Sequence, residues 1–300
     1  MVLPMAAELA GRRRVSVQEL LRHAERQLKA AGIPSPSDDA RLLMAEALSV
    51  SRTWVLANPE AEVPPDRRLL FLSYVARRAD HEPAAYIIGH RGFYDLDLEV
   101  TPAVLIPRPE TELLVEGALE ACWTLVAAGR ENLLGADLGT GSGAVAIALA
   151  VHQPRLRLIA VDRSPAALEV ARRNAARYQV LDRIEFREGD LLEGVEGPLD
   201  LLVANLPYVP SASIPRLMPD VRGYEPLEAL DGGPDGTTLI HRTLQQAIRR
   251  MGRPSALRFE IGDGQGRALI AFAARLFPRA RVQVARDYAG FERILSIDLP

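Results

Sequence analysis

Short apolar runs alternate with segments of helical spacing along the chain from Asn132 to Pro300. This alternation is typical of a mostly parallel sheet with helices on both faces. The predicted strands cover residues 133–138, 156–161, 184–187, 199–204, 256–261, 281–285 and 291–297. Helices are predicted over residues 143–151, 164–178, 238–250 and 265–277. A tight turn at residues 287–290 separates the last two strands, so these two should pair antiparallel.

The first part of the chain shows helical spacing only. Helices are predicted over residues 15–32, 37–48, 51–56 and 65–76. Ser16 and Glu19 form a capping box at the start of the first helix, and Ser37 is the expected cap of the second. The pattern predicts a small helical domain over residues 1–86. Its nearly balanced charge favours a protein-docking or lid module over a surface that follows phosphates.

Between residues 87 and 109 the spacing changes from helical to alternating. Apolar and acidic residues alternate from Asp95 to Val100, which predicts a half-buried strand within a β-hairpin linker over residues 87–109. The run Ile106–Glu112 then forms a rigid turn that leads into a helix with acidic residues in its first turn. The remaining residues, 110–300, form the α/β domain.

Composition narrows the classes to which the protein can belong. The chain has 300 residues, of which 48% are hydrophobic and 25% charged, as in a globular protein with a substantial core. Its net charge of −3 provides no general attraction to nucleic acid. The single cysteine, Cys122, is interpreted as a buried structural thiol. No apolar run is long enough to cross a bilayer and no secretion signal is recognisable, so we expect a cytoplasmic protein.

A glycine-rich loop joins the first predicted strand of the α/β domain to its helix. Glycines let the backbone approach a ligand closely, and a helix N-terminus favours carboxylate or phosphate groups. Asp162 follows the next strand, where its carboxylate can accept hydrogen bonds from both hydroxyls of a ribose. The candidate cofactor-binding residues of the loop are Asp137, Gly139, Thr140, Gly141, Ser142 and Gly143.

Two cofactor classes fit this loop. Gly139, Gly141 and Ala144 satisfy the fingerprint of NAD-binding proteins. Asp137, however, would repel a pyrophosphate and could instead meet the ammonium group of S-adenosylmethionine. The antiparallel final strands also favour S-adenosylmethionine. We therefore predict this cofactor, with Asp190 accepting from the adenine amino group and Leu191 beside it.

The candidate catalytic residues are Asn205, Leu206, Pro207 and Tyr208, which follow the fourth strand directly. Ligands of parallel α/β sheets bind at this edge. The asparagine offers one acceptor and two donors, the proline stiffens the turn, and the tyrosine provides a flat apolar face. This set suits a planar amide or amino group. The five histidines are scattered, so no metal site is predicted.

Over nearly its full length the sequence resembles the bacterial protein-(glutamine-N5) methyltransferases that modify peptide-chain release factors. The runs that carry the resemblance are Tyr86–Gly89 with Phe93, Arg108–Glu112, the glycine loop, Asn205–Tyr208, Tyr224–Gly236 and Glu260–Gly266. The resemblance implies a Rossmann-like class I S-adenosylmethionine-dependent methyltransferase fold. It also implies a helical substrate-recognition domain at residues 1–86 and a catalytic domain at residues 110–300.

The expected reaction is transfer of a methyl group to the glutamine side-chain nitrogen in the Gly-Gly-Gln motif of class I release factors. In the family, the Asn side chain and the next carbonyl hold the target amide nitrogen, roles that fall here on Asn205 and Leu206. The family has proline where this chain has Leu206, which keeps the carbonyl but loosens the turn.

Three alternatives stay open on the sequence. Adenine-N6 methyltransferases carry the same Asn-Leu-Pro-Tyr run, so RNA or DNA is a possible substrate. A ribosomal protein is another possible glutamine substrate. A non-catalytic binding module of this fold is disfavoured, because a binder has no need of amide acceptors beside a glycine loop. The near-neutral helical domain and the acidic overall balance favour a protein substrate over nucleic acid.

Overall fold

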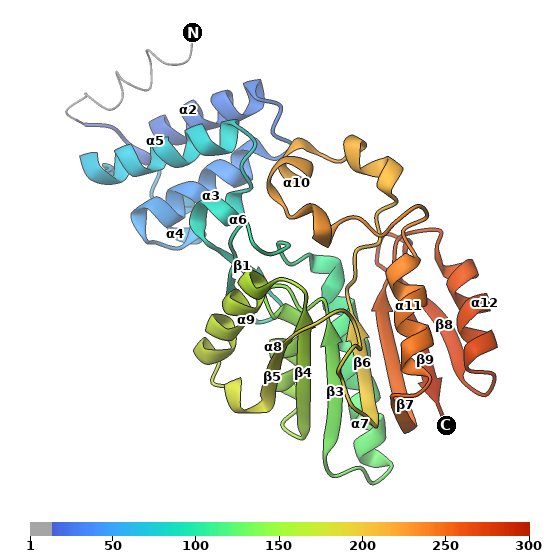
Figure 1. Cartoon of the computed structure of the whole chain (residues 1–300). Helices are drawn as coiled ribbons and strands as arrows, with labels where there is room; N and C mark the ends of the chain where they lie inside the picture. The colour runs from blue at the N-terminus through green and yellow to red at the C-terminus, as the bar shows by residue number, and fades with distance from the viewer. Residues whose placement is uncertain (1–13) are drawn as a thin grey trace. The chain divides into compact units, whose positions relative to one another are not determined.

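The computed structural model describes residues 14–300, which form two compact units (Figure 1). The first contains residues 14–89 together with Met218–Tyr224, and the second contains His90–Leu217 and Glu225–Pro300. The part of the predicted helical domain that precedes Arg14 lies outside the described residues. The inclusion of Met218–Tyr224 in the first unit has no signal in the local sequence pattern.

Among its described residues, the first unit is built from helices, with one isolated antiparallel bridge between Ser16 and Glu62. Its helices are α2 (Val17–Ala30), α3 (Pro36–Leu48), α4 (Arg52–Ala57), α5 (Pro65–Ala79), α6 (Ala84–Ile88) and α10 (Pro219–Tyr224). The predicted capping box of α2 is confirmed, since Ser16 and Glu19 exchange side-chain to backbone hydrogen bonds. The prediction for α3 is wrong: the cap position is Ser35, not Ser37, because Pro36 has the φ angle of a first helical residue and starts the helix earlier.

Arg78 of α5 ties α10 to the rest of this unit. Its side chain is buried, and its Nε donates to Asp39 Oδ2 across 2.7 Å. Its Nη2 lies 3.5 Å from Asp220 Oδ2 on α10. The hydroxyl of Tyr224 donates to the carbonyl of Asp80 across 2.7 Å. These contacts explain why a segment distant in sequence belongs to the helical unit.

The second unit begins with the predicted β-hairpin. Strands β1 (His90–Phe93) and β2 (Leu96–Glu99) pair antiparallel, and the leucines of β2 are buried while its acidic residues face partly outward. Asn174 fastens this hairpin to the sheet domain: its Oδ1 accepts from the Glu99 N–H, and its Nδ2 donates to the carbonyls of Glu99 and Ser142. The hairpin is thereby linked to the glycine loop.

The core of the second unit is a seven-stranded sheet with strand order β5-β4-β3-β6-β7-β9-β8. Strands β3 to β7 are parallel where they pair, and β9 runs antiparallel to both of its neighbours, which confirms the predicted mostly parallel sheet with an antiparallel last strand. The strands are β3 (Leu133–Leu138), β4 (Leu156–Asp162), β5 (Ile184–Glu188), β6 (Leu199–Ala204), β7 (Met251–Glu260), β8 (Arg281–Arg286) and β9 (Glu292–Leu299).

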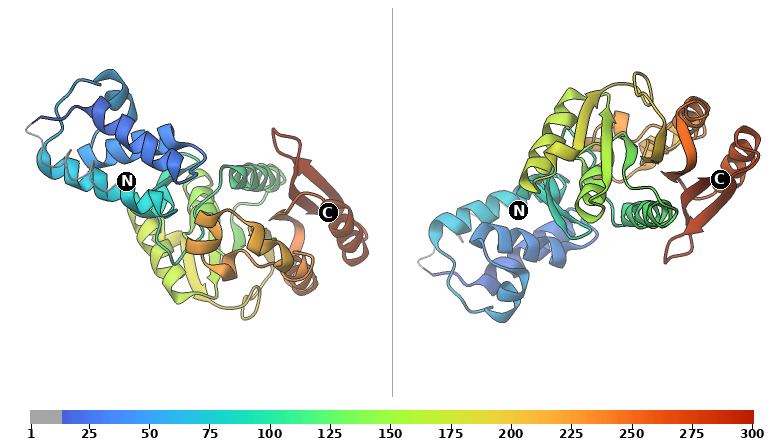
Figure 2. Two further views of the ribbon diagram at one scale, coloured as in Figure 1. Left: turned by 90° about the horizontal axis from the view of Figure 1, so that it is seen from above. Right: turned by 90° about the horizontal axis from the view of Figure 1, so that it is seen from below.

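Helices cover both faces of the sheet, as Figure 2 shows in views along the strands. Buried apolar residues of α7 (Glu112–Ala127) and α8 (Ala144–His152) form a cluster on one face, and those of α11 (Thr238–Ala247) and α12 (Gly266–Leu276) form a cluster on the other. Helix α9 (Pro165–Arg177) is capped by Ser164, whose hydroxyl accepts from the Ala167 N–H. Strand β7 starts at Met251, earlier than predicted, because that residue pairs with Leu199 of β6.

Candidate active site

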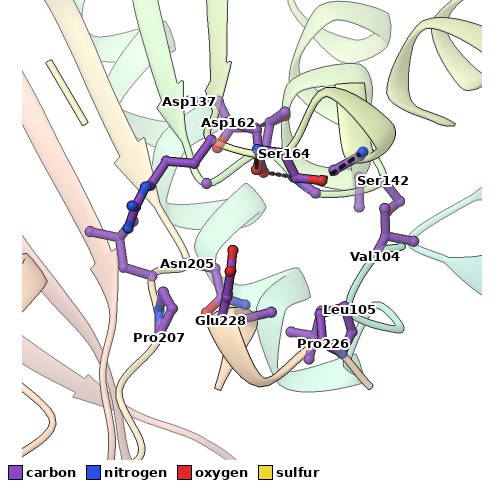
Figure 3. Close-up of a pocket in the computed structure, with 18 of the residues that line it drawn as sticks. Val104, Leu105, Asp137, Ser142, Asp162, Ser164, Asn205, Pro207, Pro226 and Glu228 are labelled. Atoms are coloured by element: carbon purple, nitrogen blue, oxygen red, sulfur yellow. Dashed lines mark hydrogen bonds between the residues drawn. The ribbon is translucent and has the colours of Figure 1, made fainter. Parts of the chain in front are cut away.

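A pocket opens at the carboxyl ends of β3, β4 and β6, where this fold places ligands (Figure 3). Asp137, Asp162 and Ser164 lie on one side of it, and Asn205 and Pro207 lie on the opposite side. The predicted residues on its wall are Asp137, Gly139, Thr140, Gly141, Ser142, Asp162, Asp190, Leu191, Asn205, Leu206 and Pro207. Gly143 and Tyr208 are not among the lining residues.

Gly143 has a packing role. It has a positive φ of 80°, and a Cβ atom there would lie 2.8 Å from Ile147 Cδ1 and 3.1 Å from Ala171 Cβ. Only glycine therefore allows the start of α8 to pack closely against α9. This packing shapes the loop from behind, whereas Gly139 and Gly141 lie on the pocket wall.

Asp137 lies beneath the glycine loop at the end of β3. Only 1% of the residue is exposed, and its Oδ2 accepts from Thr140 Oγ1 across 2.6 Å. Burial raises the pKa of Asp137 to about 7, against the opposing effect of its hydrogen bonds from Thr140 and the Ala146 N–H. A cation bound beside this carboxylate would restore its charged form. The position therefore suits an ammonium group.

Asp162 ends β4 and is held by the backbone. Its Oδ2 accepts from the Gly141 N–H across 2.8 Å, and its Oδ1 accepts from the Ser164 N–H across 2.9 Å. Burial raises the pKa of Asp162, while these backbone hydrogen bonds oppose the rise. The carboxylate is thus preorganised on the pocket wall, where it can accept hydrogen bonds from a ribose diol.

Asp190 has one oxygen engaged and one oxygen without a partner. Its Oδ2 accepts from Arg242 Nη2 across 2.8 Å, whereas Oδ1 is buried and has no hydrogen-bond partner among the residues that the structure describes. A buried carboxylate oxygen without a donor is costly unless a ligand supplies the donor. This atom fits an exocyclic amino group. Arg242 has no motif signal, and the sequence did not identify it.

Asn205 follows β6 directly, and its side-chain amide has a defined orientation. Its Nδ2 donates to Thr111 Oγ1 across 3.0 Å, so the amide oxygen is the atom left for a ligand. Leu206 is 3% exposed and belongs to the core cluster on the α11 and α12 face of the sheet. A Cβ on Gly139 would lie 3.2 Å from Leu206 Cδ2, so the leucine also packs against the glycine loop.

The Tyr208 side chain is anchored by a hydrogen bond to a buried glutamate. Its hydroxyl donates to Glu260 Oε1 across 3.1 Å, and burial together with the charge of Glu260 raises the pKa of the phenol. The other oxygen of Glu260 accepts from Thr111 Oγ1 across 2.6 Å. Thr111 and Glu260 lie in runs that carry the family resemblance, but the sequence alone assigned neither of them to the site.

Two further loops complete the site. Glu225 is buried and accepts from the Arg108 guanidinium and from the Ile106 N–H, which anchors the loop that places Pro226 and Glu228 at the pocket. The run around Gly236 wraps the Asn205–Tyr208 turn so closely that a Cβ on Gly236 would lie 2.1 Å from the Tyr208 carbonyl oxygen. The turn is therefore supported on two sides.

Across residues 14–300, no group of three or more histidine, cysteine, aspartate or glutamate side chains is arranged to hold a metal ion. Nor does this part of the chain contain a helix long and apolar enough to cross a membrane.

Two family models match the chain. The PrmC N-terminal domain matches residues 19–89, and the Methyltransferase small domain matches residues 121–215. Among solved structures, the catalytic domain of hMettl16 in complex with the MAT2A 3'UTR hairpin 6 superposes with a TM-score of 0.54 and 14% sequence identity. The match covers 78% of this chain and 84% of that one. At this identity the likeness shows the fold alone.

Relatives named release factor glutamine methyltransferase match almost the whole chain. The protein from Moorella thermoacetica is 41% identical over 93% of this chain and 97% of its own length. Those from Caulobacter vibrioides and Nitratidesulfovibrio vulgaris are 38% and 37% identical, over 91% and 93% of this chain and 92% and 94% of their own lengths. The resemblance recognised in the sequence motifs is confirmed: this chain belongs to the release factor glutamine methyltransferase family.

Proposed function

We propose that this protein transfers one methyl group from S-adenosylmethionine to the side-chain amide nitrogen of the glutamine in the Gly-Gly-Gln motif of class I peptide-chain release factors. The observation that carries the proposal is the Asn205 amide at the end of β6. Because its nitrogen is engaged by Thr111, its oxygen is available to accept an N–H from a planar amide. The names of the relatives support the glutamine of a release factor as that amide.

The pocket fits S-adenosylmethionine in three places. Asp137 would meet the methionine ammonium, Asp162 would accept from the ribose hydroxyls, and Asp190 Oδ1 would accept from the adenine amino group. The buried oxygen of Asp190 without a partner is the specific support for the last contact. The pyrophosphate of NAD would meet these carboxylates as a like charge. When bound, S-adenosylmethionine supplies a methyl group on a positively charged sulfur, which is open to attack by a weak nucleophile.

The chain's own residues would make the amide nitrogen reactive by position. An amide lone pair is delocalised into its carbonyl, so the nitrogen is a poor nucleophile. Asn205 Oδ1 and the Leu206 carbonyl would accept its two N–H groups, which orients the nitrogen and stabilises positive charge that develops on it. Tyr208 would pack against the amide plane. No side-chain base is required, and the proton can leave from the product to water.

The remaining assignments also belong to the proposal. The helical unit, predicted as residues 1–86, would recognise the release factor, the hairpin of residues 87–109 would link it, and residues 110–300 would catalyse the transfer. The enzyme would act in the cytoplasm, where translation factors are found. A protein substrate is supported by the net charge of −3, which provides no general attraction to RNA.

Three substrates test the proposal in one assay. The purified enzyme with S-adenosylmethionine is offered a class I release factor, a variant with asparagine in place of the motif glutamine, and unmodified small-subunit ribosomal RNA. Mass spectrometry should show one added methyl group on the first substrate only. A methylated RNA beside an unmodified release factor would overturn the proposal and favour the adenine-N6 alternative.

A further inference from the structure

Thr111, Glu260, Asn205 and Tyr208 form a branched hydrogen-bond network beneath the predicted catalytic turn. Thr111 and Glu260 are only 3% and 1% exposed. They come from different parts of the chain, Thr111 from the turn before α7 and Glu260 from the last position of β7. Nothing in the predicted roles of Asn205 and Tyr208 requires these two partners, so their function needs its own explanation.

The charge state of Glu260 decides which group donates in each hydrogen bond of the network. An ionised carboxylate can only accept. In its ionised form Glu260 therefore accepts hydrogen bonds from the Thr111 hydroxyl at Oε2 and from the Tyr208 hydroxyl at Oε1. With its proton committed to Glu260, the Thr111 oxygen can only accept from Asn205. The amide of Asn205 must then present its NH₂ group to Thr111 and its oxygen to the pocket.

We propose that Thr111 and Glu260 are positioning residues. They set the orientation of the Asn205 amide and the position of the Tyr208 ring against which the substrate amide would pack. Without Thr111, the Asn205 amide could flip and present donors to the substrate nitrogen, which itself carries donors. The inference rests on the proposed glutamine methylation for its kinetic test. The orientation of Asn205 can be tested without that reaction.

Protonation of Glu260 should disable the network. A neutral carboxyl can donate to Thr111 and so reverse the chain of hydrogen bonds. Burial raises the pKa of Glu260, while Thr111, Tyr208 and Arg293 oppose the rise and Glu110 adds to it. The carboxylate therefore gains its proton at a higher pH than an exposed glutamate would, and the turnover rate should fall as the pH drops through that raised pKa.

The kinetic test compares substitutions that differ by single groups. Thr111→Val removes the hydroxyl at nearly constant volume, and Thr111→Ser keeps it. We expect Thr111→Val to lower kcat on the order of tenfold to a hundredfold, since small misplacements in an active site have effects of this size. Thr111→Ser should restore most of the rate. The Kd for S-adenosylmethionine, measured by calorimetry, should stay unchanged in both variants.

A matched control separates positioning from the mere loss of a buried hydroxyl. Thr243 of α11 is also fully buried, and its hydroxyl donates to the Leu239 carbonyl across 2.9 Å. Thr243→Val should leave kcat at the wild-type value. At saturating S-adenosylmethionine, Glu260→Gln should lower kcat and remove its decline at acidic pH.

The rarity of asparagine gives a readout that needs no turnover. The chain has only four asparagines, Asn58, Asn132, Asn174 and Asn205, so selective ¹⁵N labelling yields few side-chain NH₂ signals, and Asn205→Ala assigns the relevant pair. Thr111→Val should shift that pair, while Thr111→Ser and Thr243→Val should not. Unmoved Asn205 signals together with an unchanged kcat in Thr111→Val would overturn the positioning role. A wild-type enzyme that methylates no release factor would refute the proposed function instead, and the signal shift would still decide the orientation.

Discussion

Arg242 Nη2 donates to Asp190 Oδ2 across 2.8 Å, while the second oxygen of the same carboxylate is buried and has no hydrogen-bond partner in the described part of the chain. One side of the carboxylate is thus fixed by the protein, and the other is left for a ligand.

Removal of the Asp190 carboxylate should weaken cofactor binding. Asp190→Ala takes away the acceptor proposed for the adenine amino group, and we expect a loss of about 1–3 kcal/mol in the binding free energy of S-adenosylmethionine. Asp182→Ala is a matched control, because it removes the same charge at an exposed position that is not on the pocket wall. Equal affinities of the two variants in calorimetry would contradict the role of Asp190.

Removal of the carboxylate at the end of β4 should cause a similar loss of affinity for S-adenosylmethionine. Asp162→Ala should weaken S-adenosylmethionine binding by about 1–3 kcal/mol, because the ribose hydroxyls lose a charged acceptor. The substitution also leaves the Gly141 N–H without its acceptor, which could weaken binding by itself. The affinity for an S-adenosylmethionine analogue that lacks both ribose hydroxyls should therefore be measured as well. If Asp162 binds the diol, wild type and variant should differ much less for that analogue. NAD should bind neither protein.

The affinity for S-adenosylmethionine should depend on pH through Asp137. Burial raises the pKa of this carboxyl to about 7 in the free protein, and a bound ammonium would lower it. The proton must therefore leave on binding below that pH. Affinity should rise with pH up to about 7 and then level off, with a slope that approaches about tenfold per pH unit in the acidic range. Calorimetry in buffers of different ionisation enthalpy measures the released proton.

Asp137→Asn provides the control for this titration. The variant should bind more weakly at neutral pH, and its affinity should no longer change with pH in the acidic range. A persistent pH dependence in Asp137→Asn would assign the titration to another carboxylate, such as Asp162, whose pKa is also raised by burial.

Leu206 should affect kcat through its backbone and the free energy of unfolding through its side chain. The sequence predicts that Leu206→Pro, which keeps the carbonyl and stiffens the turn, preserves or raises kcat. The buried side chain adds a second effect, since the loss of its packing against the core should lower the free energy of unfolding by about 1–3 kcal/mol. Leu206→Ala should destabilise by about 2–4 kcal/mol without stiffening the turn.

Denaturant unfolding and kcat at saturating substrate separate these two effects. Loss of activity in a folded Leu206→Pro protein would mean that the turn geometry differs from the one that the family resemblance implies for proline at this position. Such a result would strengthen the adenine-N6 alternative.

A side chain at position 236 should not be tolerated, because the carbonyl oxygen of Tyr208 lies too close to Gly236. A Cβ there would lie 2.1 Å from the Tyr208 carbonyl oxygen, and the φ of Gly236 is +77°. Gly236→Ala should therefore displace the predicted catalytic turn and lower kcat. It should also lower the free energy of unfolding by more than the roughly 1–2 kcal/mol that a positive φ alone costs an alanine. Gly290→Ala is the control, because Gly290 also has a positive φ, of +90°, but nothing lies within 4 Å of the added atom. Similar unfolding midpoints for the two variants would contradict the argument.

The sequence predicted correctly those helices and strands whose limits are set by residues close to them in the chain. Strands β3 and β6 begin and end where the apolar runs do, and the hydroxyls of the caps Ser16 and Ser164 accept from backbone N–H groups three residues further on. For α3 the predicted cap, Ser37, lies two residues after the observed cap, Ser35, because Pro36 occupies the first helical position. In each case the deciding information lies within one turn of helix or one strand.

Contacts between distant segments were not predictable in this way. Thr111 and Glu260 are 149 positions apart, and only the fold shows that their side chains are hydrogen-bonded. Arg242 lies on a helix whose periodicity explains its buried face but says nothing about the pairing with Asp190. Gly143 matched a loop motif, although its tightest neighbours are Ile147 and Ala171. The sequence therefore located the pocket better than it located the residues that support it.

The path of the chain through the two units restricts how they can be separated. Asp220 and Tyr224 belong to the helical unit through Arg78 and Asp80, although the residues on either side of Met218–Tyr224 belong to the sheet unit. A single break after Gly89 would leave α10 attached to the wrong fragment, and Arg78 would lose one of its two acidic partners. The helical unit is thus discontinuous in sequence, so limited proteolysis, gene fusion or recombination at one junction cannot exchange it intact.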